Sequence, residues 1–328
     1  MQVKKYFIIV AILVVPLIYV LSRNTTGNPH IGNQVAFKKQ LSNYHLFKGE
    51  MSALHPEAGV EVLELSSTLF TDYAEKQRLI RLPAGKKMKL KGNGLPDFPE
   101  GTLIAKTFYY PSENRKRLQI VETRLLIFAG STWNVATYQW NDDQTDALLI
   151  EEGATVRVDV EDLSGERRQI AYHIPSNKEC VSCHHSGNAI LPIGPKVRNL
   201  NRPVQREGKQ FNQLAYLINK GLIESSRLDS FQHMPSYRDN NLPVEQRARA
   251  YMDINCAHCH QSGGYAGQTT INLDYNTNLR HSGIELNKNN ILIRMNEMGE
   301  YHMPKLGTTV VDKEGLALIE AYIKNLKN

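Results

Sequence analysis

Cys180-Val181-Ser182-Cys183-His184 and Cys256-Ala257-His258-Cys259-His260 decide the fold, and they contain all four cysteines of the 328-residue chain. Two thiols three positions apart lie on one face of a helical turn. There they can add to the two vinyl groups of one haem, while the next histidine supplies a nitrogen to the iron. C-x-x-C-H is the attachment motif of haem c. The sequence therefore predicts two covalent haem c groups, held by Cys180, Cys183, Cys256 and Cys259, with His184 and His260 as iron ligands.

Three other uses of these cysteines stay open on spacing alone. Two C-x-x-C pairs are also typical of a zinc site, although zinc does not require a histidine directly after each pair. A redox-active dithiol would leave both histidines without a role. Two structural disulfides would suit an exported protein, although a bridge across so short a spacing is strained.

The N-terminus has the pattern of an export segment. Lys4 and Lys5 precede residues 6–21, which carry no charge, as in the basic and apolar regions of a signal peptide. A membrane span needs about 20 apolar residues, so residues 1–24 fit either a cleaved signal peptide or an uncleaved signal anchor. Both predict a periplasmic protein, and the second predicts attachment to the inner membrane through this segment.

The composition excludes several classes of protein. The chain is 41% hydrophobic and 22% charged, which is ordinary for a globular protein. Its net charge is +6, and Lys4, Lys5 and Arg23 around the apolar run contribute three of these charges. A polyanion-binding domain carries a concentrated basic face, so we expect no nucleic-acid partner. Residues 25–59 show no apolar period and contain several glycines, which predicts a linker.

Residues 60–175 predict an antiparallel β domain, because their apolar pattern has a period of two. Turn residues separate runs of β-branched and aromatic residues, and the clearest runs are 102–110, 118–128, 132–140, 155–160 and 169–174. Several short strands with regular turns are typical of a sandwich or half-barrel.

The period becomes helical after Pro175. A capping box over residues 176–179 predicts a helix that begins just before Cys180. Further helices are expected around 211–220, from Pro243 into Cys256, and after Asp312. We therefore predict an α+β multidomain protein, with a first haem c unit at 176–242 and a second, cytochrome c-like unit at 243–328.

Other residues resemble the iron surroundings of class I cytochromes c. Gly194-Pro195 follows His184 by ten residues and resembles their Gly-Pro loop. The resemblance implies that the Pro195 carbonyl accepts the Nδ1–H of His184, a bond that orients a ligating histidine. The second cluster has no Gly-Pro, and residues 268–273 occupy the equivalent stretch.

The sixth ligands are expected in two Met-Pro sequences. Met303-Pro304 lies before the last helix, as in the distal ligand loop of class I cytochromes c, and predicts Met303 as the ligand of the second haem. Met234-Pro235 predicts Met234 for the first haem. Competing residues stay open: Met295, Met298 and His302 for the second haem, and His173, His185, His233 or an open iron for the first.

Longer stretches resemble an uncharacterised family of bacterial dihaem c-type cytochromes with a β-rich N-terminal half. In the β region they are residues 69–78, 106–111, 122–126 and 140–147, and in the helical region they are residues 192–201, 247–251 and 255–260. The resemblance implies haem binding, electron transfer and a periplasmic or envelope location. It supplies no substrate.

We therefore expect an electron carrier rather than a catalyst, working with a redox partner protein or a component of the respiratory chain. Two alternatives remain open. One haem could have an open site and act as a peroxidase or oxidase, or the β domain could be a binding module connected to a redox partner.

Overall fold

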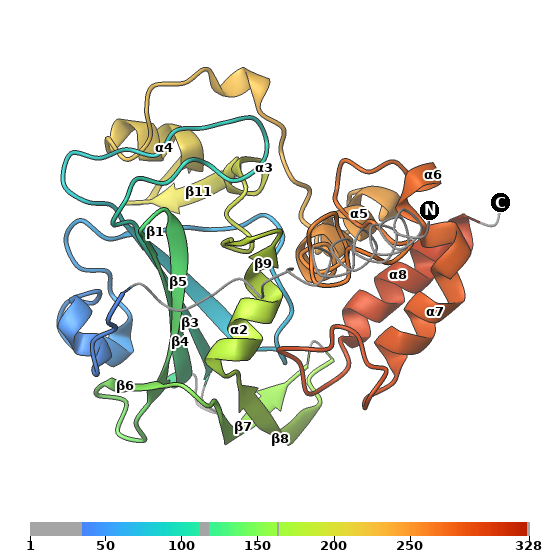
Figure 1. Cartoon of the computed structure of the whole chain (residues 1–328), viewed down its shortest axis with the longest axis horizontal. Coiled ribbons are helices and arrows are strands. Elements are labelled where there is room, and N and C mark those ends of the chain that lie inside the picture. The colour runs from blue at the N-terminus through green and yellow to red at the C-terminus, as the bar shows by residue number, and fades with distance from the viewer. Residues whose placement is uncertain (1–34, 112–117, 163, 327–328) are drawn as a thin grey trace, which may run out of the picture. The chain divides into compact units, whose positions relative to one another are not determined.

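The computed structural model describes residues 35–111, 118–162 and 164–326, all of which belong to one compact unit, 34–328. The predicted export segment lies outside these residues. Among the described residues, no helix is both long and apolar enough to cross a bilayer. An antiparallel sheet dominates the N-terminal part and helices dominate the C-terminal part, which confirms the predicted mixed α+β class (Figure 1).

The main sheet has six antiparallel strands that follow one another in chain order. They are β1 (Glu61–Val62), β2 (Glu75–Arg81), β3 (Leu103–Pro111), β4 (Leu118–Ala129), β5 (Thr132–Trp140) and β6 (Ala147–Ile150). A separate hairpin follows, made of β7 (Ala154–Glu161) and β8 (Arg167–Ile174). The five predicted runs coincide with β3, β4, β5, β7 and β8 to within two residues. Strand β2 was not predicted, because its charged residues hide the alternation.

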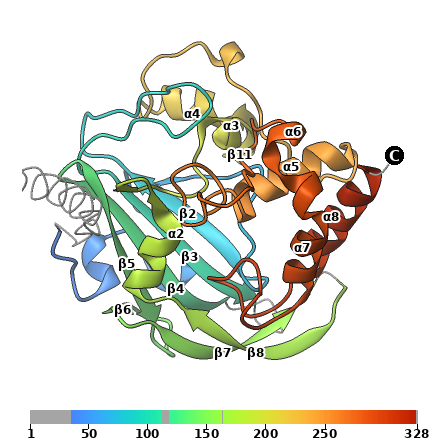
Figure 2. The same cartoon turned by 45° about the vertical axis from the view of Figure 1, so that its right-hand side comes forward.

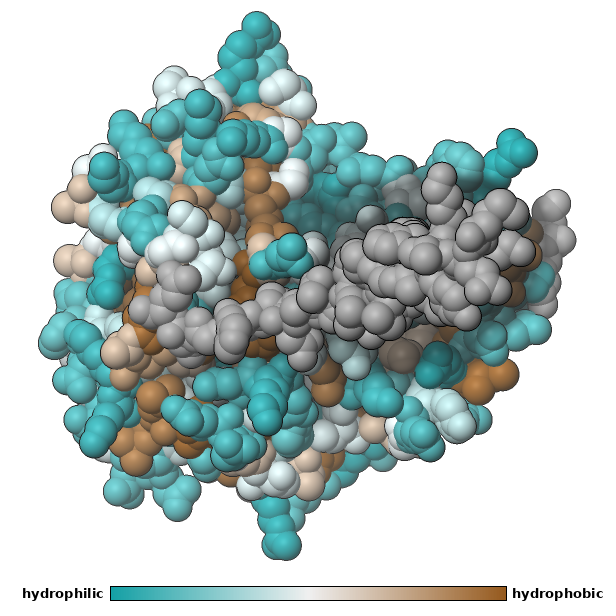
Figure 3. Space-filling view, in the orientation of Figure 1, coloured by the Kyte–Doolittle hydropathy of each residue, from teal (hydrophilic) through white to brown (hydrophobic). Residues whose placement is uncertain are grey.

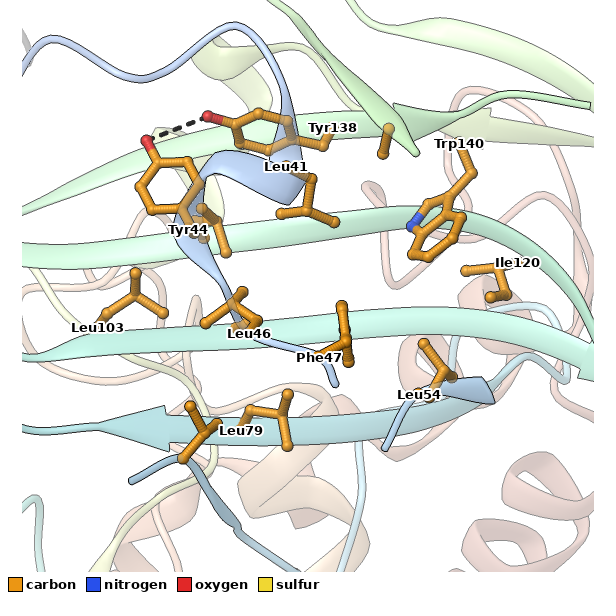
Figure 4. Packing of buried hydrophobic residues seen from close by; sticks show 14 of the residues in the cluster. Leu41, Tyr44, Leu46, Phe47, Leu54, Leu79, Leu103, Ile120, Tyr138 and Trp140 are labelled. Carbon is orange, nitrogen blue, oxygen red and sulfur yellow. Dashed lines mark hydrogen bonds between the residues drawn. The ribbon is translucent and has the colours of Figure 1, made fainter. Parts of the chain in front are cut away.

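One face of the sheet is covered by residues that the sequence analysis assigned to a linker. This segment contains the short 3-10 helices η1 (Leu41–Tyr44) and η2 (Met51–Ala53), and five of its side chains, two of them from η1, are buried on the sheet. Figure 4 shows them: Leu41, Tyr44, Leu46, Phe47 and Leu54. The linker prediction is therefore wrong for this segment. It failed because 3-10 turns and left-handed residues at His45 and Leu54 leave no regular apolar period.

The helical part begins with α2 (Asn177–His184), which lies against the opposite face of the sheet (Figure 2). The other helices are α3 (Val197–Leu200), α4 (Gln213–Asn219), α5 (Val244–Asn255), α6 (Leu279–Ser282), α7 (Ile284–Asn296) and α8 (Lys313–Asn325). The hairpin of β11 (Pro203–Arg206) and β12 (Lys209–Asn212) precedes α4. The predicted caps are confirmed, since Ser176 and Glu179 bond reciprocally and Asp312 accepts the Gly315 N–H.

Helix α8 packs on both α5 and α7, and the three helices share an apolar core. Polar contacts join this group of helices to the part of the chain that forms the sheet. The buried carboxylate of Asp72 accepts the N–H groups of Thr309 and Val310, and the Asn255 side chain accepts the Phe70 N–H at 2.7 Å. These bonds fix the start of α8 and the end of α5 against the loop before β2.

Candidate functional site

The first C-x-x-C-H cluster lies on α2, against strand β5. The capping box fixes the start of the helix, so Cys180 and Cys183 follow one another by one turn. Cys180 is buried, and its Sγ is 3.6 Å from Oγ1 of Thr137. Burial raises the pKa of Cys183 to about 12 and also raises the pKa of Cys180. Both thiols are therefore protonated at neutral pH, and all four cysteines of the chain are free.

The ring of His184 is held by one backbone carbonyl. Its Nδ1 is 2.7 Å from the carbonyl oxygen of Leu191. Burial lowers the pKa of His184 to about 3, so the ring is neutral at pH 7 and Nδ1 is the nitrogen that donates. The lone pair of Nε2 is then available, which is the arrangement of a histidine that binds a metal.

The prediction that Pro195 accepts this hydrogen bond is wrong. A tight hairpin of β9 (His185–Ser186) and β10 (Ala189–Ile190) turns the chain back directly after His184. The Leu191 N–H donates to the His184 carbonyl at 2.8 Å. This bond holds Leu191 beside His184, so the Leu191 carbonyl, and not that of Pro195, accepts the hydrogen bond from the ring. Gly194 has a structural role instead, because its φ is 109° and an added Cβ would lie 2.8 Å from Leu65 Cδ1.

The second cluster directly follows α5. The His260 N–H donates to the Cys256 carbonyl at 2.9 Å, and the Leu273 N–H donates to the His260 carbonyl at 2.8 Å. His260 Nδ1 lies 3.4 Å from Oγ1 of Thr269. The group next to Nδ1 of His260 is therefore the hydroxyl of Thr269, from the 268–273 stretch that replaces a Gly-Pro loop in the second cluster. Burial raises the pKa of Cys256 to about 12, so this thiol is also protonated at neutral pH.

The two clusters are neighbours in space, although 76 residues separate them in the sequence. The Gly187 N–H, three residues after His184, donates to the Gly263 carbonyl at 2.8 Å. An added Cβ on Gly263 would lie 3.1 Å from the Gly187 nitrogen, so this close approach requires glycine. The thiol of Cys259 contributes, after burial, to the raised pKa of Cys183.

Two cavities contain residues of both clusters. Both are lined by Cys183, His184 and His258. The larger one, about 740 Å³, also reaches Trp133 of the sheet and has the volume of a small-molecule pocket. The smaller one, about 70 Å³, also reaches Cys180 and the sheet face below α2.

The sheet face in the smaller cavity carries a row of cations. Arg78, Lys106 and Arg124 are register partners on β2, β3 and β4, and Thr137 beside Cys180 continues the row on β5. Arg124 pairs with the buried Glu122. Burial and then the neighbouring Arg78 lower the pKa of Lys106, which favours its neutral amine. The positive charge of the row therefore lies on Arg78, whose pKa stays at about 10, and on Arg124.

This row was not predicted from the sequence. The available signal was a charged residue at an inward position of an otherwise apolar strand, namely Lys106 in β3 and Arg124 in β4. Such residues are rarely buried without a partner or a ligand. The row could have been found by asking which strand face each charge occupies.

The predicted ligand Met303 lies in a loop that approaches both clusters. Its N–H donates to the Arg294 carbonyl at 2.9 Å, and the Arg294 charge contributes, after burial, to the lowered pKa of His260. The next residues of the loop, including Pro304 and Leu306, line the smaller cavity. The competitor His302 is engaged at both nitrogens, by the Glu297 carbonyl at 2.7 Å and by Thr308 Oγ1 at 3.2 Å.

The structure places Met234 elsewhere. Its side chain is buried, its N–H donates to the Arg198 carbonyl, and it lines neither cavity that contains His184. Two of the alternative ligands, His173 and His233, also line neither cavity. His173 Nε2 is 2.9 Å from Glu179, and His233 Nδ1 is 2.7 Å from the Asn201 carbonyl. His185 lines the larger cavity.

Apolar side chains near the second cluster are exposed. Leu286 and Ile293, seven residues apart on one face of α7, are 88% and 52% accessible, and Met298 and Tyr301 in the next loop are also exposed. Figure 3 shows hydrophobic side chains at the right, where α7 lies. A helix with apolar residues on its outer face normally packs against another protein surface or a ligand.

Within the described ranges, no three His, Cys, Asp or Glu side chains come together as a metal site. Comparisons with family models, with curated proteins and with solved structures found no match.

Proposed function

We propose that the chain is a dihaem c-type cytochrome that transfers electrons in the bacterial periplasm or envelope. The observation that carries the proposal is that two C-x-x-C-H clusters lie side by side. The thiols of both clusters are free, and the Nε2 of His184 is available. Haem iron supplies a one-electron couple when it is bound. The chain would anchor the groups through Cys180, Cys183 and the two cysteines of the second cluster, and would ligate the irons with His184 and His260.

The surroundings fit this cofactor. A haem is a large apolar ring with two carboxylates, so it needs apolar cover and cations. The exposed face of α7 offers apolar surface in the same segment as the second cluster. The row of Arg78, Lys106 and Arg124 offers positive charge next to the first. These features support two haem units, the second of them resembling a class I cytochrome c.

A carrier exchanges electrons with another protein rather than with a bound substrate. We propose a redox partner protein or a component of the respiratory chain as the partner. The contact of Gly187 with Gly263 supports electron exchange between the two haems inside one chain. The N-terminal segment would export the protein and, if it is retained, would attach it to the inner membrane.

A dihaem redox enzyme is the second candidate, and the cavity of about 740 Å³ beside His184 favours it. Carbon monoxide separates the two functions, because it binds ferrous haem only where a coordination position is free. We expect the reduced protein to keep its Soret spectrum under carbon monoxide, since in an electron carrier two side chains of the protein would ligate each iron. A stoichiometric carbon monoxide adduct of the unmodified protein would contradict the carrier function and support the enzyme.

The role of Met303 gives a further prediction. Replacing Met303 with His is expected to lower the potential of the second haem, because a thioether favours ferrous iron more than imidazole does. The shift should be about 0.1 V or more, within the range of about 0.8 V that axial ligands span. Redox titration is done with the first haem removed by Cys180→Ser and Cys183→Ser.

Met298→Leu is the matched control, since Met298 is a half-exposed methionine of the preceding loop. It should leave both the potential and the near-infrared thioether band unchanged. If Met303→His also leaves them unchanged, Met303 is a packing residue, and Met295 has to be tested as the ligand.

A further inference from the structure

The first haem needs a sixth ligand, and the second C-x-x-C-H cluster contains a histidine that the motif itself does not use. His258 lies directly before Cys259, between the two cysteines that are proposed to anchor the second haem. Its side chain, however, lines both of the cavities that His184 lines.

His258 also has an unsatisfied atom. Its Nδ1 is buried and has no partner within hydrogen-bond geometry among the described residues, although the Ile254 backbone is close enough to raise the pKa of the ring. A buried polar atom without a partner costs free energy, and such atoms in a folded protein often indicate a missing ligand or ion. The residues predicted for this role are less suitable, because Met234, His173 and His233 line neither of the two cavities.

We propose that His258 is the sixth ligand of the first haem. The second cluster would then supply a ligand to both irons. His260 would bind the iron of the second haem, and His258 would bind the iron of the first. This inference rests on the proposed function, because it requires haem at the first cluster. It makes ligation of the first haem depend on the folding of the segment after Pro243, and it makes the two haems different: bis-imidazole for the first and imidazole–thioether for the second.

The test compares two full-length proteins that carry both haems, the unmodified protein and its His258→Leu variant. Near-infrared magnetic circular dichroism of the ferric protein should show one bis-imidazole haem, and the leucine variant should lose that signal. The reduced variant should gain one carbon monoxide equivalent per chain. Because leucine could impair folding, His258→Met is made as well, and it should replace the bis-imidazole band with a second thioether band.

Two control variants replace other residues that could be mistaken for the ligand. Met234→Leu removes the ligand predicted from the sequence, and Lys106→Gln removes the amine that lines the smaller cavity. Neither should release a coordination position. The inference is overturned if the unmodified protein shows two thioether-ligated haems, if His258→Leu keeps its bis-imidazole signal, or if a control variant gains the carbon monoxide adduct. A purified protein without haem would overturn the proposed function instead.

Discussion

Replacing both Cys256 and Cys259 with serine is expected to remove one haem and to unfold the segment from residue 243 onward, while the sheet persists. That segment is about 85 residues long, a size at which an apolar core alone is marginal. It exposes Leu286 and Ile293, and a bound haem would supply the missing apolar cover. Circular dichroism should show loss of most of the helical signal, because α5, α7 and α8 are the three longest helices described.

The same pair of substitutions in the first cluster is the matched control. Cys180→Ser with Cys183→Ser also removes one haem, but it leaves the shared core of α5, α7 and α8 intact. Its helical signal should stay close to that of the unmodified protein. An unchanged thermal transition and an unchanged helical signal in the second-cluster variant would contradict haem-dependent folding.

Asp253→Asn is expected to destabilise the protein by about 3 kcal/mol, since breaking a buried ion pair leaves an uncompensated charge. The Asp253 carboxylate is 3% exposed and lies 2.8 Å from the guanidinium of Arg198, which is 2% exposed. The same oxygen is 2.9 Å from Lys196 and accepts the Tyr275 N–H. The pair joins α3, just after the first cluster, to α5, just before the second, so the loss should weaken both haem sites.

Urea unfolding monitored in the Soret region measures this effect. Asp229→Asn is the control, because Asp229 pairs with Arg227 on the surface, where both side chains are mostly exposed. Such a pair contributes about 0–1 kcal/mol. Equal urea midpoints for the two variants would show that Asp274, 3.5 Å from Arg198, replaces Asp253 without loss.

Local signals were enough to predict much of the fold. Alternation marked β3, β4 and β5, and the capping residues Ser176 and Asp312 marked α2 and α8. These signals act within a few residues, so the sequence displays them directly. The segment around Leu41 shows the limit, because its apolar residues acquire a role only when the sheet lies beneath them.

The candidate site was predictable where the motif is covalent and local. The cysteines and His184 could be identified from spacing, but their neighbours could not. The acceptor of His184 is Leu191 rather than Pro195 because a hairpin intervenes. The cationic row and His258 depend on strand register and on the meeting of two distant clusters, which no local pattern records.

The central claim is covalent haem at both clusters, and its most direct measurement is a haem count on purified protein. The full chain is expressed in a host that matures c-type cytochromes, and a pyridine haemochrome assay is normalised to protein by amino-acid analysis. The account predicts two c-type haems per chain, and one after serine replacement of either cysteine pair. Protein that contains no haem, with zinc or disulfides at the cysteines, would contradict it.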